Sequence, residues 1–226
     1  MRKIFLALLA VAALASPAYA ADMPTKAPAY APPVMASWAG FYIGLQAGYG
    51  WFDPTYTFVG ASAVSFDTKG FVGGGTVGYN WQTGPLVLGV EGDISFADVK
   101  GSILTTAAPC SLDGCTAKLD WFGTGRLRAG YAMGDWMPYV TGGAAVGHVK
   151  GSADTLACFP ATTCVFGQTR WGWTVGGGLE YRFARNWSAK VEYLYMNLGS
   201  PSFNVGTVTA DDFAYNIVRG GVNFRF

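Results

Sequence analysis

Hydrophobic and polar residues alternate with a period of two along most of the chain after Gly40. In the first such segment Phe41, Ile43 and Leu45 share one face, and the residues between them form the other face. Alternation of this kind predicts a β-strand with one apolar face. It recurs in eight segments, although both faces of 136–148 are small and apolar, so the inward face of that segment is not assigned. The predicted strands are 41–52, 70–81, 86–96, 119–131, 136–148, 171–183, 187–195 and 218–226.

The connections between these strands alternate in length. We predict long loops at 53–69, 97–118, 149–170 and 199–213, and short turns at 82–85, 132–135 and 184–186. An even number of strands with this asymmetry is typical of outer-membrane barrels. The pattern therefore predicts an all-β fold, an eight-stranded antiparallel up-and-down transmembrane β-barrel. Its long loops would be extracellular, and both chain ends would lie with the turns in the periplasm.

Aromatic residues of the apolar face gather at the strand ends. Trp51, Trp121 and Trp171 lie near the long loops, and smaller apolar residues fill the middle of the strands. Trp81 and Trp187 lie near the short turns. Two aromatic girdles around an apolar band indicate a surface that faces lipid. The alternative is a soluble, lipocalin-like barrel, which would need the apolar face inside, around a ligand cavity.

The opposite face carries ionisable side chains, which we predict to form a network in the lumen. Burying so many charges requires extensive pairing, and we expect Glu91 and Asp93 to pair with Arg126 and Arg128. An eight-stranded barrel holds little more than side chains, so we interpret the network as a plug; the alternative is a selective pore. The network comprises Glu91, Asp93, Arg126, Arg128, Glu180, Arg182, Lys190, Glu192 and Arg219, with Asp120 and Arg225 also facing inward.

The N-terminus differs from the rest of the chain. Arg2 and Lys3 precede an apolar run from Ile4 to Ala15, and Ala18-Tyr19-Ala20 provides small residues at a cleavage position. This arrangement predicts a signal peptide over 1–20. Residues 21–37 are rich in proline and lack periodicity, which predicts an extended periplasmic tether. The barrel would then occupy 38–226.

Composition excludes several classes of protein. The chain is 51% hydrophobic and only 13% charged, which excludes intrinsic disorder. Its longest apolar run falls short of the length of a membrane-spanning helix. Lys and Arg number 15 against 14 Asp and Glu, so no basic excess indicates nucleic acid as a partner. We predict no enzymatic activity and no cofactor.

Four cysteines and one histidine are the candidates for disulfides and for metal or heme binding. The cysteines form two close pairs, and export to an oxidising compartment favours disulfides within each pair. Zinc is the alternative, but no histidine lies close to either pair. His148 is the only histidine and starts a predicted long loop, so it is the one candidate heme or metal contact. The predicted disulfides join Cys110 to Cys115 and Cys158 to Cys164.

Three segments resemble one known family. The opening WAGFYIGLQAGYG at 38–50, PYVTGGAA at 138–145 and the ending VNFRF are similar to the alphaproteobacterial outer-membrane immunogenic proteins, which are related to the OmpA-type barrel domain. The likeness covers about 38–226. Within the ending, Val222, Phe224 and Phe226 resemble the signal read by the barrel-assembly machinery. Some members of the family are described as hemin-binding and others as surface antigens or structural proteins.

The function expected from these observations is that of a structural, surface-exposed barrel whose loops form the working surface. The alternatives are a small-solute, porin-like channel and a hemin-binding surface receptor. Expected partners are outer-membrane lipid and lipopolysaccharide, the barrel-assembly machinery, and small solutes or host surface molecules.

Overall fold

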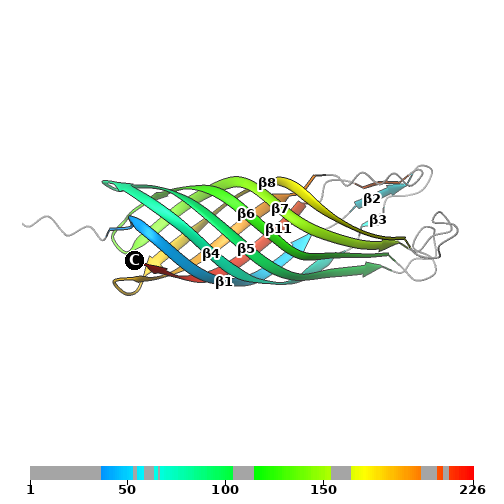
Figure 1. Cartoon of the computed structure of the whole chain (residues 1–226), viewed down its shortest axis with the longest axis horizontal. Helices are drawn as coiled ribbons and strands as arrows, with labels where there is room; N and C mark the ends of the chain where they lie inside the picture. The colour runs from blue at the N-terminus through cyan, green and yellow to red at the C-terminus, as the bar shows by residue number, and fades with distance from the viewer. Residues whose placement is uncertain are drawn as a thin grey trace, which may run out of the picture. The chain divides into compact units, whose positions relative to one another are not determined.

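Eight antiparallel strands close into a barrel in the computed structural model (Figure 1). The structure describes residues 37–52, 55–58, 64–65, 67–103, 115–153, 164–199, 208–210 and 214–226. The predicted fold class is confirmed, whereas the predicted signal peptide and nearly all of the tether lie outside the described residues. In their order around the barrel the strands are β1 (Gly40–Phe52), β11 (Ala214–Arg225), β9 (Trp187–Asn197), β8 (Cys164–Arg182), β7 (Trp136–Ala153), β6 (Cys115–Tyr131), β5 (Leu86–Ile103) and β4 (Thr68–Thr83).

Tight turns define one end of the barrel, which we call the turn end. Two of these turns use glycines with positive φ, Gly84 at 59° and Gly134 at 65°, a conformation that a residue with a side chain adopts only rarely. The C-terminus lies at this end as well (Figure 1), where the Phe226 N–H donates to the Phe41 carbonyl at 3.0 Å. The first and last strands therefore meet and close the barrel.

The opposite end, which we call the loop end, extends further than the sequence pattern predicts. β5 continues to Ile103 before β6 begins at Cys115, and β7 continues to Ala153 before β8 begins at Cys164. The predicted loops at 97–118 and 149–170 are therefore too long. The predicted strands end where the apolar outer face ends, but backbone pairing continues past that point because backbone hydrogen bonds between strands do not depend on apolar side chains.

Parts of the other two predicted loops also pair. β2 (Thr55–Phe58) pairs with β3 (Val64–Ser65) and with β10 (Val208–Ala210). These strands form a separate three-stranded sheet from segments that we predicted as loops within 53–69 and 199–213.

A β-bulge in β6 changes which side chains face the lumen. Leu119 pairs with Val149 and Trp121 pairs with His148, so Asp120 is an extra residue between them. One inserted residue reverses the alternation on one side of it. Leu119 is therefore fully buried in the lumen although we predicted it to face outward. Asp120 is not the lumen charge that we predicted, because it bonds to exposed lysines outside.

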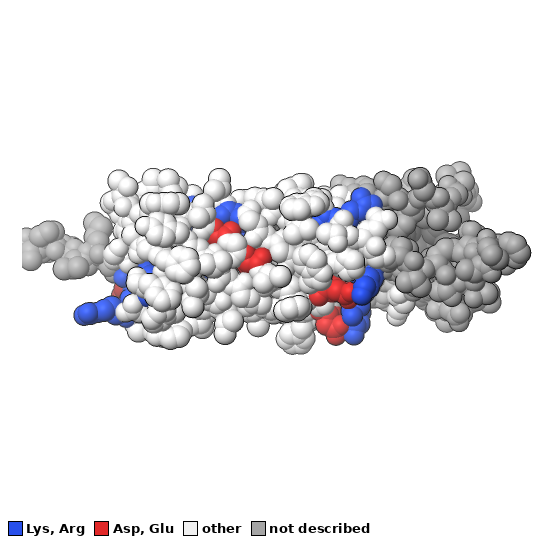
Figure 2. Space-filling view, viewed as in Figure 1, with Lys and Arg blue, Asp and Glu red and all other residues white. Residues whose placement is uncertain are grey.

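The outer face of the barrel is apolar. Leu45, Phe71, Phe96, Leu127 and Trp171 are each at least 70% exposed. Figure 2 shows that charged side chains are sparse over the barrel wall. This arrangement is the reverse of a soluble barrel around an apolar ligand cavity, so the lipocalin-like alternative is wrong. The described residues contain no helix that is long and apolar enough to span a membrane.

Candidate functional site

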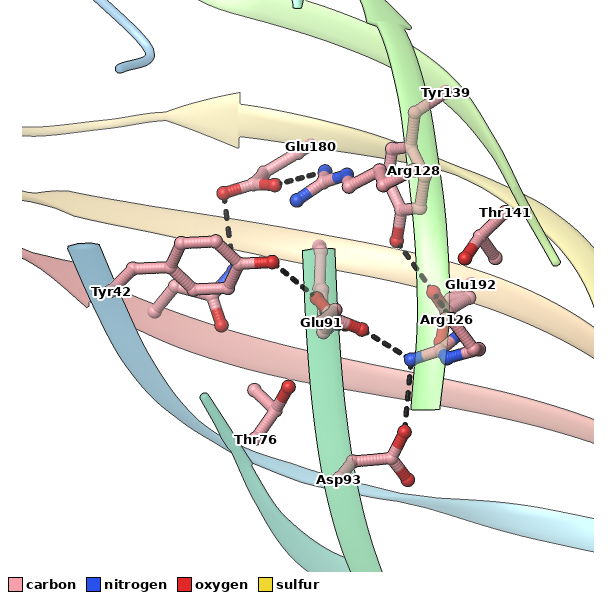
Figure 3. A network of polar contacts seen from close by, with 12 residues as sticks. Tyr42, Thr76, Glu91, Asp93, Arg126, Arg128, Tyr139, Thr141, Glu180 and Glu192 are labelled. Carbon is pink, nitrogen blue, oxygen red and sulfur yellow. Dashed lines mark hydrogen bonds and ion pairs between the residues drawn. The ribbon is translucent and has the colours of Figure 1, made fainter. Parts of the chain in front are cut away.

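Six charged side chains meet in the middle of the lumen, and Figure 3 labels Glu91, Asp93, Arg126 and Glu192 among them. Their neighbours along each strand point outward into the apolar face, so the alternation of the strands directs the charges inward. None of the six side chains is more than 2% exposed. We call this group the central ion network; its members are Glu91 and Asp93 on β5, Arg126 on β6, Lys190 and Glu192 on β9, and Arg219 on β11.

Arg126 bonds to all three carboxylates of the central ion network. One of its terminal nitrogens donates to Glu91 and also to Asp93, the latter at 3.0 Å. The other donates to Glu192 at 3.0 Å. A guanidinium group presents donors in a fixed fork, which allows a single arginine to hold several acceptors.

Two further cations complete the network from the other side of the lumen. Arg219 donates to Asp93 at 2.9 Å and to Glu192 at 2.7 Å. Lys190 lies 3.1 Å from Glu91. Three cations thus face three anions, so the central ion network carries no net charge. A buried ion has a large desolvation cost unless it is paired, and each member here is paired.

A second cluster surrounds Glu180, nearer the turn end. The carboxylate accepts hydrogen bonds from Arg128 and Ser188. It also accepts from Asn223 at 3.1 Å and from Arg225 at 3.5 Å. Arg128 lies on β6, Ser188 on β9, and Asn223 and Arg225 both lie on β11, so the cluster ties β6, β8, β9 and β11 together across the lumen.

The position of Arg128 differs from the sequence prediction. We expected it to pair with a carboxylate of β5, but it bonds to Glu180 instead, so that pairing is wrong. The residue opposite Arg128 on β5 is Gly89, which offers no side chain. The guanidinium group stacks on the ring of Tyr139, 3.7 Å from its centroid, and this contact turns it toward β8.

Two tyrosines extend the networks, and the sequence analysis did not identify them. The Tyr42 hydroxyl donates to Glu91 at 2.7 Å, and the Tyr139 hydroxyl donates to Glu192 at 3.0 Å. Each ring lies over a glycine of the neighbouring strand, Gly78 and Gly178 respectively, and a Cβ at either glycine would collide with the ring. An inward tyrosine opposite an inward glycine is thus the signal that could have revealed them.

Trp38 closes the lumen at the turn end. Its side chain is fully buried, and its backbone N–H donates to the Gln82 side chain at 2.6 Å. Arg182 and Arg225 lie over its ring, 4.3 and 4.8 Å from the centroid. Arg182, which we predicted in the lumen network, therefore lies at the turn end in a cation–π contact. Val87 and Met137 pack beside Trp38.

Apolar side chains fill the lumen at the loop end. The largest of these pack as one cluster, and the rings of Phe52 and Tyr215 lie 4.4 Å apart within it. Sequence analysis did not predict this layer, because the inward face was expected to be polar along its whole length. We call it the apolar layer; its members are Phe52, Val72, Ala97, Val99, Ala117, Leu119, Phe122, Ala145, Leu194, Met196, Leu198, Tyr215 and Ile217.

His148, the candidate heme or metal contact, does not face the lumen. Its ring is stacked against Trp121 on the outside of the barrel, with centroids 6.4 Å apart and planes within 5°. Its Nδ1 lies 3.2 Å from the Thr169 hydroxyl. In the part of the chain that the structure describes, no group of three or more His, Cys, Asp and Glu could hold a metal ion.

The remaining predicted site residues lie near the two ends of the barrel. At the turn end Val222 and Phe226 are exposed, and the Phe224 ring lies 5.2 Å from Phe226 and 5.1 Å from Trp187. At the loop end the predicted disulfides stay a prediction. Cys110 and Cys158 fall outside the described residues, and so do the side chains of Cys115 and Cys164.

Comparisons with known proteins give the chain a family. The family model described as "Outer membrane protein beta-barrel domain" matches residues 6–226. A 31 kDa outer-membrane immunogenic protein of Brucella melitensis is 36% identical over 247 residues, covering all of both chains. A 22 kDa outer membrane protein of Rhizobium leguminosarum is 32% identical over 84% of this chain and 79% of its own length. Among solved structures, Neisserial surface protein A aligns over 83% of this chain and 98% of its own, with 17% identity and a TM-score of 0.45.

The match to the family model covers nearly the whole chain, and the Brucella relative matches from end to end. The resemblance to outer-membrane immunogenic proteins is therefore confirmed. The chain belongs to the outer-membrane β-barrel family that includes these proteins, and its place is the bacterial outer membrane.

Proposed function

We propose that this protein is a closed outer-membrane barrel that presents its loop end on the cell surface and does not conduct solutes. The observation that carries the proposal is the filling of the lumen by side chains at three successive levels. Trp38 with its two arginines occupies the turn end, the ion clusters occupy the middle, and the apolar layer occupies the loop end.

Each level opposes conduction for a different physical reason. The apolar layer offers no hydrogen bonds to water, and hydrophobic constrictions close pores by excluding water. In the middle, a passing ion would have to break bonds between charges that already satisfy one another. At the turn end, the buried Trp38 ring lies under two guanidinium groups. A solute would have to displace all three levels.

The charge balance of the lumen also favours a plug over a selective pore. Selectivity filters commonly use rings of charge of one sign. The central ion network has three cations and three anions in direct contact, so it presents no uniform field to a passing ion. Its contacts instead join strands on opposite sides of the barrel, which supports a structural role.

The orientation rests on the general architecture of outer-membrane barrels, in which periplasmic turns are short and extracellular loops are long. The turn end of this barrel would then face the periplasm and the loop end the exterior. Loops on a rigid scaffold are the usual place for recognition, so the contact of the cell with its surroundings would be made there.

Solute flux through proteoliposomes tests the proposal. The refolded protein is reconstituted into vesicles, and osmotic swelling is followed in a neutral pentose, with a general porin in parallel vesicles as the positive control. We expect vesicles with this protein to swell no faster than empty vesicles. Swelling at a rate near that of the porin would overturn the closed-lumen function.

A further inference from the structure

Four lysines form one row across four neighbouring strands near the loop end. Lys69 on β4 pairs directly with Lys100 on β5, Lys100 pairs with Lys118 on β6, and Lys118 pairs with Lys150 on β7. Paired residues of a sheet point to the same side, and the inward positions beside them are buried. All four lysines therefore point outward. We call this row the lysine ladder.

The ladder contains every outward lysine of the described barrel. The chain has three other lysines: Lys3 and Lys26 precede the described residues, and Lys190 belongs to the central ion network. Strands are about 4.8 Å apart, so the backbone positions of the ladder span about 14 Å. The remainder of the wall that faces lipid carries no lysine among the described residues. The outward lysines of the described barrel are therefore confined to one row and are not distributed over its surface.

Two aspartates lie among the lysines without neutralising them. Asp98 lies 2.7 Å from Lys100 and 4.0 Å from Lys118. Asp120, at the bulge of β6, lies 3.1 Å from Lys118 and 2.7 Å from Lys150. Within the row and its ion pairs, four cations therefore stand against two anions; the exposed Asp67, two positions before Lys69, makes no ion pair with the row.

The fourth lysine of the ladder has no such neighbour. Lys69 makes no ion pair with any carboxylate in the described part of the chain. Like charges directly opposite on a sheet are destabilising. The lysines of the ladder therefore repel one another, and the two aspartates do not fully offset this repulsion. The lysine side chains are accessible, with 41% of Lys118 and 60% of Lys100 exposed.

The ladder lies at the edge of the apolar band. Phe71 follows Lys69 toward the middle of the barrel on β4, and Phe96 lies beyond Asp98 on β5; both are more than 70% exposed, and Trp51 of β1 pairs with Lys69. Exposed aromatic residues mark the level where hydrocarbon meets headgroups. Figure 2 shows the corresponding gathering of blue and red side chains beside the grey atoms. The lysines thus stand where the headgroups of the surrounding lipid would be.

We propose that the lysine ladder binds the phosphate groups of outer-leaflet lipopolysaccharide, an inference that rests on the orientation in the proposed function, with the loop end outside. The proposal rests on charge complementarity and position, because the side chains of the ladder are cationic, point outward and lie level with the headgroups. A phosphorylated headgroup lying along the row would screen the mutual repulsion of the lysines.

Binding of purified lipopolysaccharide to the refolded protein in detergent tests the ladder, with the dissociation constant measured by thermophoresis. The variant replaces Lys100, Lys118 and Lys150 with glutamine. Each lysine near an anionic membrane surface changes affinity about fivefold, so we expect about a hundredfold weaker binding. The single variant Lys118→Gln is compared with Arg185→Gln, which removes one exposed charge at the turn end. We expect about fivefold weaker binding in the former and no change in the latter.

Two further arms keep the test decisive. Asp98→Asn raises the net charge of the lysine ladder and should tighten the binding of lipopolysaccharide. If the lysines served only to form ion pairs with the aspartates, this substitution would not increase the affinity. Inorganic phosphate should compete weakly. Unchanged binding in the triple variant, equal losses at Lys118 and Arg185, or equally tight binding of free phosphate would overturn the proposal. If the triple variant lacks the gel mobility of the folded barrel, the single variants and Asp98→Asn decide the question.

Discussion

Removing one charge from the central ion network should destabilise the barrel strongly, and removing its partner as well should cost less than the sum of the two single effects. Arg219 lies 2.7 Å from Glu192 and 2.9 Å from Asp93, and all three side chains are almost completely buried. At an effective dielectric constant of about 20, each contact is worth about 6 kcal/mol of attraction. Desolvation cancels most of that gain, and removal of one partner from a buried pair costs about 3–5 kcal/mol. We expect this cost for Glu192→Gln and for Arg219→Met.

The double variant provides the critical comparison. With both residues replaced, two carboxylates and two cations remain, and the network is neutral again. The double variant should therefore be more stable than the sum of the single effects predicts, by about 2–3 kcal/mol. The pair of Lys150 and Asp120 on the outer surface is a matched control, because its separation is also 2.7 Å while its side chains are 55% and 19% exposed. Its coupling should be at most about 1 kcal/mol.

Urea unfolding in lipid vesicles measures these free energies, with the folded fraction read from the mobility of unheated samples on gels. The coupling in the lumen should also persist at high salt, since buried pairs are screened little. Single variants that each cost less than about 1 kcal/mol and combine additively would refute the reasoning, because they would mean that water reaches each charge independently.

Three further predictions concern the ends of the barrel. In a background without native cysteines, a membrane-impermeant maleimide should label Ser102→Cys on intact cells but not Asp135→Cys; the reverse pattern would overturn the orientation. Deletion of Phe226 should lower the amount of folded protein in the outer membrane while leaving refolding in detergent unchanged, because we predict that the residue belongs to the signal read by the barrel-assembly machinery; equal amounts in cells would contradict this. Serine at all four cysteines should leave the folded gel mobility unchanged and weaken binding of antibodies raised against native cells, since the predicted disulfides shape loop tips; loss of the folded band would show that they hold the barrel. The cysteines concerned are Cys110, Cys115, Cys158 and Cys164.

The sequence was sufficient to predict the strands and most inward side chains, because alternation assigns each residue to a face. It could not predict the bulge at Asp120, because the bulge inserts a single residue and the amino acids around it do not mark its position. The error at Leu119 follows directly from that bulge. Strand ends at the loop end were also placed too early, because the apolar pattern stops before the backbone ladder does at Ile103.

Partners across the lumen were beyond the reach of sequence patterns. Asp93 and Arg219 are 126 residues apart, and they meet only because the sheet closes with a particular stagger between strands. Pairing the charges of strands that are adjacent in sequence correctly predicted the contacts of Arg126 with β5, but it assigned the partner of Arg128 to the wrong strand. The sequence places Trp38 only at the start of the first-strand motif, because its role in closing the turn end depends on guanidinium groups from β8 and β11.

Planar bilayer conductance of the refolded wild-type protein tests the closed lumen most directly. Filling at all three levels predicts a silent membrane after insertion, over the full range of applied voltage and at high salt, with insertion verified by the gel mobility of protein recovered from the vesicles used for fusion. Discrete, reproducible current steps that scale with the amount of folded protein would contradict the account and establish a channel instead.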